Sequence, residues 1–144
     1  MKKILFLSFI VITACNPKLQ QKPLEVDVVE STSGEIIMLG EINLANLQTS
    51  SVTPWFKKEF DRVNINLKEA KELKPLTKDL KIFVFMGTWC EDSQRELPLF
   101  FKMLTAMNFD QEHLKMFAMS EEKSTPSNFE QGLEINYIPT IIFF

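Results

Sequence analysis

The stretch that decides the fold is KIFVFMGTWCEDS, residues 81–93. Residues 81–86 are rich in β-branched and aromatic side chains, which predicts a buried strand. Residues 87–88 make a turn, and apolar side chains at helical spacing then predict a helix over residues 91–107. Cys90 is therefore expected where a strand gives way to the N-terminus of a helix.

This position favours chemistry at the sulfur of Cys90. The free N–H groups and the dipole of a helix N-terminus stabilise a thiolate relative to a thiol. Ser93 follows one turn later, and its hydroxyl is placed to donate a hydrogen bond to the sulfur. Glu91 and Asp92 act in the opposite direction, because nearby carboxylates disfavour a further negative charge. The alternative is an inert cysteine, packed as a small apolar side chain in the turn.

Three motifs in this order and spacing resemble the thioredoxin superfamily. Residues 89–93, Trp-Cys-Glu-Asp-Ser, stand where that family has Trp-Cys-x-x-Cys, and Pro98 has the spacing of its helix-kinking proline. Residues 138–140, Ile-Pro-Thr, match the segment that opens a later sheet strand. The resemblance implies an α/β, thioredoxin-like three-layer fold. It also implies catalytic roles for Cys90 and Ser93, a cis proline facing the sulfur, and binding roles for Trp89, Ile138, Pro139 and Thr140.

The chain departs from the family at two positions. Ser93 replaces the resolving cysteine, and Val84 replaces the buried aspartate that many thioredoxins have six residues before the first cysteine. A mixed disulfide at Cys90 would therefore need an external thiol for its release. This pattern predicts monothiol thiol–disulfide exchange. The alternatives are a redox-inactive peptide- or protein-binding module and a one-cysteine peroxidase, although Gly87 stands where the peroxidase pattern has threonine.

The N-terminus reads as a processing signal. Residues 1–14 combine two lysines with a short apolar stretch, and Cys15 closes a sequence that resembles a lipobox. We expect a lipoprotein signal peptide over 1–14 and a lipidated Cys15 followed by a tether over 15–33. The alternatives are an ordinary signal peptide and a short anchor. The form Gly-Thr-Trp-Cys-x-Asp-Ser-Gln-Arg-Glu at residues 87–96 also resembles thioredoxin-like lipoproteins of bacterial envelopes. This resemblance implies a lipid-anchored, periplasm-facing protein.

Composition and cysteine usage limit the partners. A lipidated Cys15 leaves Cys90 as the only free thiol, so the expected partners are envelope protein thiols or disulfides and an external reductant thiol. The net charge of −3 becomes about −5 without Lys2 and Lys3, which argues against nucleic acid as a partner. With no Cys-His cluster, a metal site is not expected, and no cofactor is predicted.

The rest of the chain predicts one domain over residues 34–144. It is expected to be incomplete at its C-terminus, because the last strand and helix of thioredoxins have no counterpart after Phe144; a truncated gene product or an incomplete record is the hypothesis. The expected strands cover residues 35–39, where Gly40 would end the strand, 114–119 and 140–144. The expected helices cover residues 44–48, 65–73 and 126–132, and a further helix begins after Thr53, which would be its N-cap. The strands at 81–86 and 114–119 should be parallel.

Overall fold

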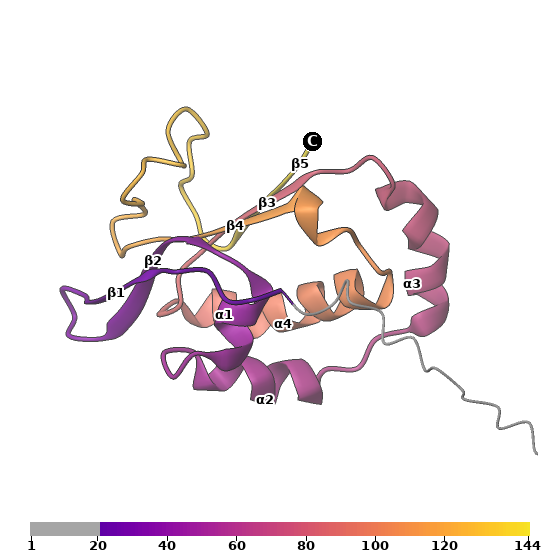
Figure 1. Cartoon of the computed structure of the whole chain (residues 1–144), viewed down its shortest axis with the longest axis horizontal. Coiled ribbons are helices and arrows are strands. Elements are labelled where there is room, and N and C mark those ends of the chain that lie inside the picture. Colours follow the sequence, from indigo (N-terminus) through magenta and orange to yellow (C-terminus); the bar gives the residue numbers. More distant parts are fainter. Residues whose placement is uncertain (1–20) are drawn as a thin grey trace, which may run out of the picture.

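The computed structural model describes residues 21–144, which form an α/β arrangement of one five-stranded sheet and four α-helices (Figure 1). The predicted α/β class is confirmed. The predicted signal peptide and Cys15 lie outside the described residues. The strands are β1 (Asp27–Glu30), β2 (Ile36–Ile42), β3 (Ile82–Met86), β4 (Leu114–Ala118) and β5 (Thr140–Phe143), and the helices are α1 (Leu44–Thr49), α2 (Pro54–Arg62), α3 (Leu67–Leu73) and α4 (Glu91–Ala106), with 3₁₀ turns η2 (Lys74–Thr77) and η3 (Gln111–His113).

The sheet has the strand order β1-β2-β4-β3-β5. Its centre is the parallel pair of β3 and β4, in which Ile82 lies opposite Leu114 and Met86 lies opposite Ala118. The other three pairs are antiparallel. The parallel pairing predicted for the two strands that flank α4 is therefore confirmed, and α4 is the crossover between them.

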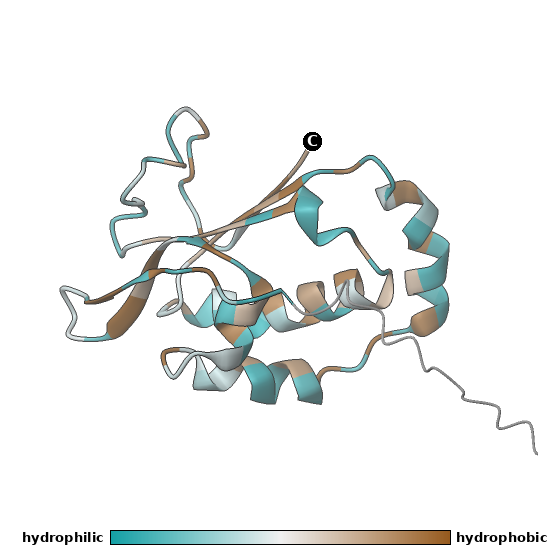
Figure 2. Ribbon diagram, in the orientation of Figure 1, coloured by the Kyte–Doolittle hydropathy of each residue, from teal (hydrophilic) through white to brown (hydrophobic). Residues whose placement is uncertain are grey.

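Alternation along β3 divides the core in two. Ile82, Val84 and Met86 point to the helical side, where they join residues of α1, α2 and α4. Phe83 and Phe85 point to the other side, where they pack with Ile138 and with residues of the long segment after β4. Figure 1 shows α1, α2 and α4 on one side of the sheet and the yellow 119–139 segment on the other. Figure 2 shows the most apolar residues concentrated in the strands.

Gly40 does not end β2, contrary to the sequence-based expectation. β2 continues to Ile42 with Gly40 inside it, at a φ of 103°. Up to Leu39 the strand pairs with β1, and from Gly40 it pairs with β4. A change of partner needs a local bend in the strand, and glycine adopts the required positive φ without steric cost.

Part of the segment predicted as a tether, residues 15–33, forms a strand of the sheet. Within residues 15–33, Asp27–Glu30 form β1, which pairs with Ile36–Leu39 of β2. β1 is an edge strand and all four of its residues are exposed, so no alternation of buried apolar and exposed polar residues marks it in the sequence. Leu24 is held next to α1, since its N–H and C=O both bond to the Asn46 amide at 3.1 and 2.8 Å.

Two further local predictions are corrected. Thr53 precedes α2, but its hydroxyl donates to the Leu47 carbonyl at 2.9 Å and makes no cap bond. Residues 126–132 form turns and not a helix. Asn128 adopts a left-handed φ of 51° there, and a helix cannot continue through such a residue.

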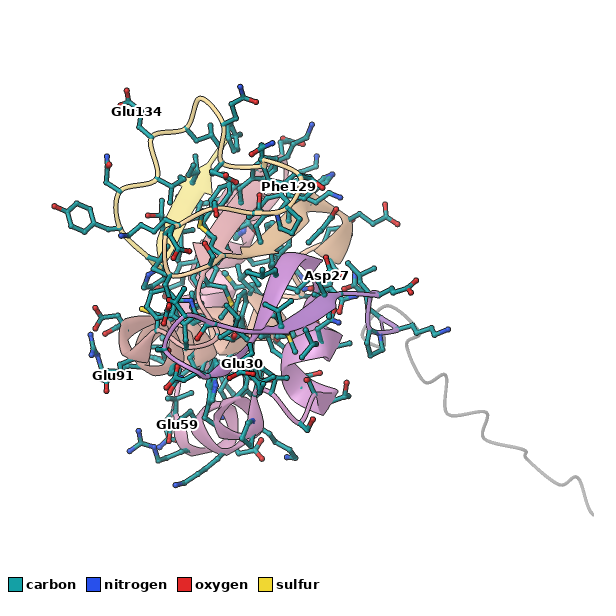
Figure 3. The ribbon with its side chains drawn as sticks, turned by 90° about the vertical axis from the view of Figure 1, so that its left-hand side faces the viewer. Asp27, Glu30, Glu59, Glu91, Phe129 and Glu134 are labelled. Atoms are coloured by element: carbon teal, nitrogen blue, oxygen red, sulfur yellow. The ribbon has the colours of Figure 1, made fainter. Side chains whose placement is uncertain are left out.

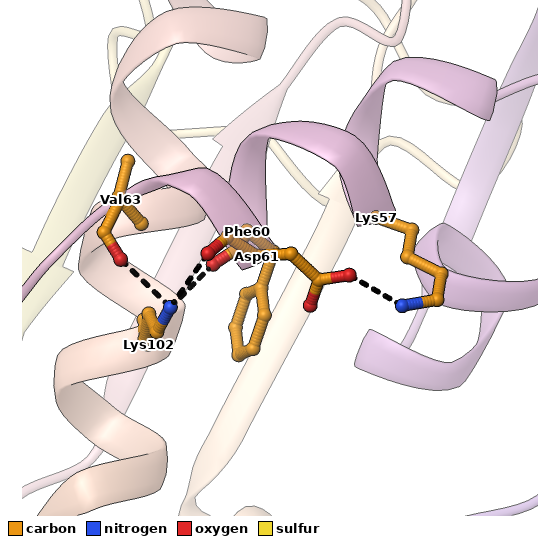
Figure 4. A network of polar contacts seen from close by, with 5 residues as sticks. All are labelled: Lys57, Phe60, Asp61, Val63 and Lys102. Carbon is orange, nitrogen blue, oxygen red and sulfur yellow. Dashed lines mark hydrogen bonds and ion pairs between the residues drawn. The ribbon is translucent and has the colours of Figure 1, made fainter.

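The helices α2 and α4 are joined through Lys102 (Figure 4). Its ammonium group donates to the carbonyl oxygens of Phe60 at 2.8 Å, Asp61 at 3.3 Å and Val63 at 2.7 Å. These carbonyls end α2, where the helix has free acceptors and a partial negative charge.

Within residues 21–144, no helix combines the length and apolar character needed to cross a membrane.

Candidate functional site

Cys90 is the N-cap residue of α4, as the sequence predicts. Its backbone is extended, with φ −79° and ψ 118°, and its N–H donates to the Gly87 carbonyl at 3.1 Å. Its half-buried thiol donates to the carbonyl oxygen of Ile138 at 3.6 Å. The Ile138–Pro139 peptide bond is cis, as the family resemblance implies. The fold therefore brings together two motifs that are 48 residues apart in the sequence.

Trp89 lies over the turn between β3 and α4. Its indole Nε1 donates to the Met119 carbonyl at 3.0 Å, so the ring connects this turn to the end of β4. The ring also lies directly against Gly87, where an added Cβ would be 2.7 Å from the indole Cε2 and Nε1 atoms and 3.0 Å from the Ile138 Cδ1 atom. Any larger residue at position 87 would displace the tryptophan or Ile138.

Ser93 has a different partner from the one expected. Its side chain is fully buried, and its Oγ accepts a hydrogen bond from the Gly87 N–H at 3.3 Å. Among the described residues, no hydrogen bond joins Ser93 to the Cys90 sulfur. Ser93 therefore holds the turn against the first turn of α4, and the expected hydroxyl–sulfur bond is absent from this part of the chain.

Ile138, Pro139 and Thr140 line the other side of the site. Ile138 is buried and packs in one apolar cluster with Trp89 and Cys90. Thr140 begins β5, lies opposite Phe85 of β3, and donates through its hydroxyl to the Tyr137 carbonyl at 2.5 Å. The hydroxyl of Thr140 is therefore directed along its own chain.

Two residues near the site had no specific role in the sequence analysis. The buried Thr88 accepts a hydrogen bond from the Met38 N–H through its Oγ1 at 3.2 Å, which ties the turn to β2. Gln94 donates from its side-chain amide to the Thr88 carbonyl at 2.9 Å. Both residues belong to the motif of residues 87–96, but the motif does not show which groups they bond to, because Met38 lies in another element.

The charges in the first turns of α4 are mostly negative. Glu91 and Asp92 stand at the helix N-terminus, where the dipole favours them. Arg95 pairs with Asp92 at 2.6 Å and with Glu96 at 2.7 Å. The pKa of Arg95 is raised, most of all by the hydrogen bond that it donates to Glu96 and next by its interaction with Asp92. Arg95 is therefore engaged by its own helix. Figure 3 shows Glu91 and Glu134 directed outward from the same side of the molecule.

The segment between β4 and β5 is held by a local hydrogen-bond network around Glu130. The Thr125 hydroxyl donates to one carboxylate oxygen at 2.5 Å and the Thr125 N–H donates to the other at 3.3 Å. Burial opposes ionisation of Glu130, but these bonds outweigh it, so the pKa of Glu130 lies below its ordinary value. Phe129 is seated by the same turn and stacks on Phe117 of β4, with ring centroids 4.5 Å apart.

The site offers one sulfur nucleophile beside a carbonyl group and a half-open apolar surface. Within residues 21–144, no three His, Cys, Asp or Glu side chains gather in a group able to hold a metal ion.

Comparison of the chain with protein-family models, with curated proteins and with solved structures gives no match.

Proposed function

We propose that this chain has a thioredoxin-like fold and performs thiol–disulfide exchange through Cys90 alone. The observation that carries the proposal is the position of the Cys90 sulfur. It lies at the N-terminus of α4, 3.6 Å from the carbonyl oxygen that precedes cis Pro139. The three motifs of the family resemblance support the same reading, with Trp89, Ile138, Pro139 and Thr140 as the surface that receives a partner.

The proposed reaction has two exchange steps. The Cys90 thiolate attacks one sulfur of a partner disulfide, which forms a Cys90–partner disulfide and releases the other partner sulfur as a thiolate that takes up a proton. An external thiolate then attacks the partner sulfur of the mixed disulfide and releases the Cys90 thiolate. Ser93 cannot perform this second step, because a hydroxyl forms no disulfide. An external thiol, of an envelope protein or a small reductant, is therefore the second substrate.

The test measures the rate of mixed-disulfide formation between Cys90 and bis(2-hydroxyethyl) disulfide by mass spectrometry. The full chain carries Cys15→Ser, so that Cys90 is its only thiol. The same protein unfolded in urea at the same pH is the reference, because unfolding removes the helix N-terminus. A favourable helix N-terminus stabilises an anion by about 0.3–2 kcal/mol, but a stabilised thiolate is also a weaker nucleophile, which cancels about half of the gain. We therefore expect the folded protein to react about 1.3- to 7-fold faster. Glutathione should then restore the free thiol.

A folded protein that reacts more slowly than the unfolded chain would contradict this proposal. The control is Ser93→Ala, which removes the hydroxyl but leaves the sulfur and the α4 N-terminus. Under single-cysteine exchange, it should keep adduct formation and its release by glutathione. A loss of release in Ser93→Ala would contradict this account, in which the hydroxyl supports the Gly87 turn and has no part in release.

A second function is favoured by the bonded state of the thiol. The Cys90 thiol donates to the Ile138 carbonyl, and the neighbouring Ser93 is buried and bonded to the Gly87 N–H. Hydrogen bonds that are all satisfied in this way also fit a cysteine that takes no part in redox chemistry. The chain would then be a redox-inactive peptide- or protein-binding module. Its partner binding would survive Cys90→Ala, whereas capture through a mixed disulfide would not.

The proposed location is the cell envelope, with the chain anchored to the membrane by lipid on Cys15 and facing the periplasm. The support is the sequence of residues 1–15 and the resemblance to envelope lipoproteins. Growth with labelled fatty acid and comparison of the natural chain with Cys15→Ser tests it. Label should be incorporated into the natural chain and be absent from the variant.

A further inference from the structure

A cavity lies away from Cys90, between the α3–η2 segment and the end of α4. It has a volume of about 480 Å³ and is open to solvent. Residues of η2 and its flanks form one wall, and the turn after α4 forms the other. Its size falls within the range of small-molecule sites, about 300–1,000 Å³. The proposed exchange chemistry does not use it.

The floor of this cavity is apolar. Met107 and Phe109 line it and are otherwise buried, with 5% and 6% of their surface exposed. Asn108 between them has a left-handed φ of 52°, which reverses the chain at the end of α4. The Phe109 N–H then donates to the Leu104 carbonyl at 2.9 Å and holds the aromatic residue against the helix. The floor is therefore built by a defined turn.

The rim of the cavity is cationic. Lys71, Lys74 and Lys78 line it, and within residues 21–144 none of the three takes part in an ion pair. Lys68 on the same helix pairs with Glu72 at 3.9 Å and lies outside the lining. The one acidic lining residue is Asp110, whose carboxylate accepts from the Glu112 N–H at 3.1 Å. Three positive charges thus face one negative charge in a chain with a net charge of −3.

The end of α4 does not by itself account for three lysines. A helix C-terminus carries about half a negative elementary charge, which one nearby cation balances. The remaining positive charge at the rim lacks a protein partner in the described part of the chain, and it lies beside an apolar floor. An anionic group attached to an apolar body complements both features.

We propose that this cavity binds a small anionic amphiphile. The apolar body packs on Met107 and Phe109, and a carboxylate or phosphate group lies among Lys71, Lys74 and Lys78. Such a group can belong to a free single-chain acid or to a lipid within a bilayer, and the test separates these two sources.

The experiment titrates the full chain with three probes of equal chain length, octanoate, octanol and octylammonium. The two ions are kept below their micelle concentrations and octanol below its solubility limit. Backbone amide NMR signals report the site. We expect saturable shifts at residues 71–78 and 107–110 with octanoate, at least tenfold weaker binding of octylammonium, and intermediate binding of octanol. Raising the salt concentration from 50 to 500 mM should weaken octanoate binding and leave octanol binding nearly unchanged.

The matched variants are the triple substitution Lys71→Gln, Lys74→Gln, Lys78→Gln and the single control Lys68→Gln. All four side chains are exposed, so circular dichroism should show unchanged folding. The triple variant should lose at least tenfold in octanoate affinity, and the control should lose none. A parallel arm adds vesicles with and without phosphatidylglycerol; shifts at the same residues would identify a bilayer lipid as a second source of the group.

Several results would overturn the proposal. These are equal affinity for octanoate and octylammonium, shifts confined to residues outside the cavity, and octanoate binding unaffected by the triple substitution. Binding to anionic vesicles with no response to octanoate would also overturn it, because it would indicate a charged surface without an apolar cavity. None of these outcomes depends on Cys90, so the result is independent of the exchange reaction.

Discussion

Replacing Gly87 by alanine tests the packing on which the Cys90 turn depends. The new Cβ would lie 2.7 Å from two indole atoms of Trp89 and 3.0 Å from Ile138, whereas ordinary carbon contacts begin at about 3.4 Å. The ring therefore has to move by several tenths of an ångström. Its Nε1 is held at 3.0 Å by the Met119 carbonyl, so this movement lengthens or breaks a hydrogen bond.

The expected change in the unfolding free energy combines two destabilising effects and one stabilising effect. Overpacking of this kind costs about 1–3 kcal/mol, and loss of the indole bond costs about 0.5–1.5 kcal/mol. Alanine also restricts the unfolded chain, which stabilises the protein by about 0.4–1 kcal/mol where the native backbone suits it. Gly87 does not have a left-handed φ, so its backbone suits alanine. The net destabilisation of Gly87→Ala is therefore about 0.5–4 kcal/mol.

The assay is urea unfolding followed by far-ultraviolet circular dichroism, in the natural chain and in Trp89→Leu. The smaller leucine removes the indole contacts, so most of the cost of Gly87→Ala should disappear in that background. Gly40→Ala is the control. It has open space around its Cβ but a φ of 103°, so its cost comes from backbone strain and should be equal in both backgrounds. A change in unfolding free energy below about 0.5 kcal/mol for Gly87→Ala, or an equal cost without the indole, would refute the reasoning.

Two further substitutions test the contacts that hold the domain. Lys102→Met keeps the apolar stem but removes the ammonium bonds to the end of α2, and we expect the free energy of unfolding in urea to fall by about 1.5–3 kcal/mol. The control Lys57→Met removes an exposed ion pair and should change the free energy of unfolding by less than about 1 kcal/mol. Equal effects of the two substitutions would contradict this account. For Glu130→Gln, the sign follows from the lowered pKa: the carboxylate stabilises the folded state above its unfolded pKa of about 4.5, and this contribution is lost as the pH falls through the lower folded value. The variant should therefore be less stable than the natural chain at pH 7 and approach it at pH 3; a stability difference independent of pH would contradict the assignment.

Local sequence patterns were sufficient for the elements whose own residues determine them. The β-branched and aromatic run over 82–86 forms β3, and the apolar spacing from Glu91 forms α4, because burial of these faces agrees with their intrinsic preferences. The position of Cys90 between them follows from the same pattern. One local feature was not predicted: the side chain of Asn66 caps α3 by accepting hydrogen bonds from the N–H groups of Lys68 and Glu69.

Contacts with other segments decided what the local pattern of a single element does not determine. Asp27–Glu30 become a strand only because Ile36–Leu39 supply the other half of the ladder, and Gly40 stays inside β2 because β4 takes over the pairing there. Ser93 bonds to the Gly87 N–H and not to the neighbouring sulfur, because burial of the first turn of α4 places its hydroxyl beneath the backbone of the turn.

The sequence by itself determined the α/β class, the order of β3, α4 and β4, and the presence of Cys90 at a helix N-terminus. Only the tertiary structure decided that the Cys90 sulfur meets the Ile138 carbonyl, that the irregular 119–139 segment covers one face of the sheet, and that three lysines border one apolar cavity. The physical reason is that propensity and periodicity act over a few residues, whereas these contacts join segments tens of residues apart, and their geometry exists only after the sheet has formed.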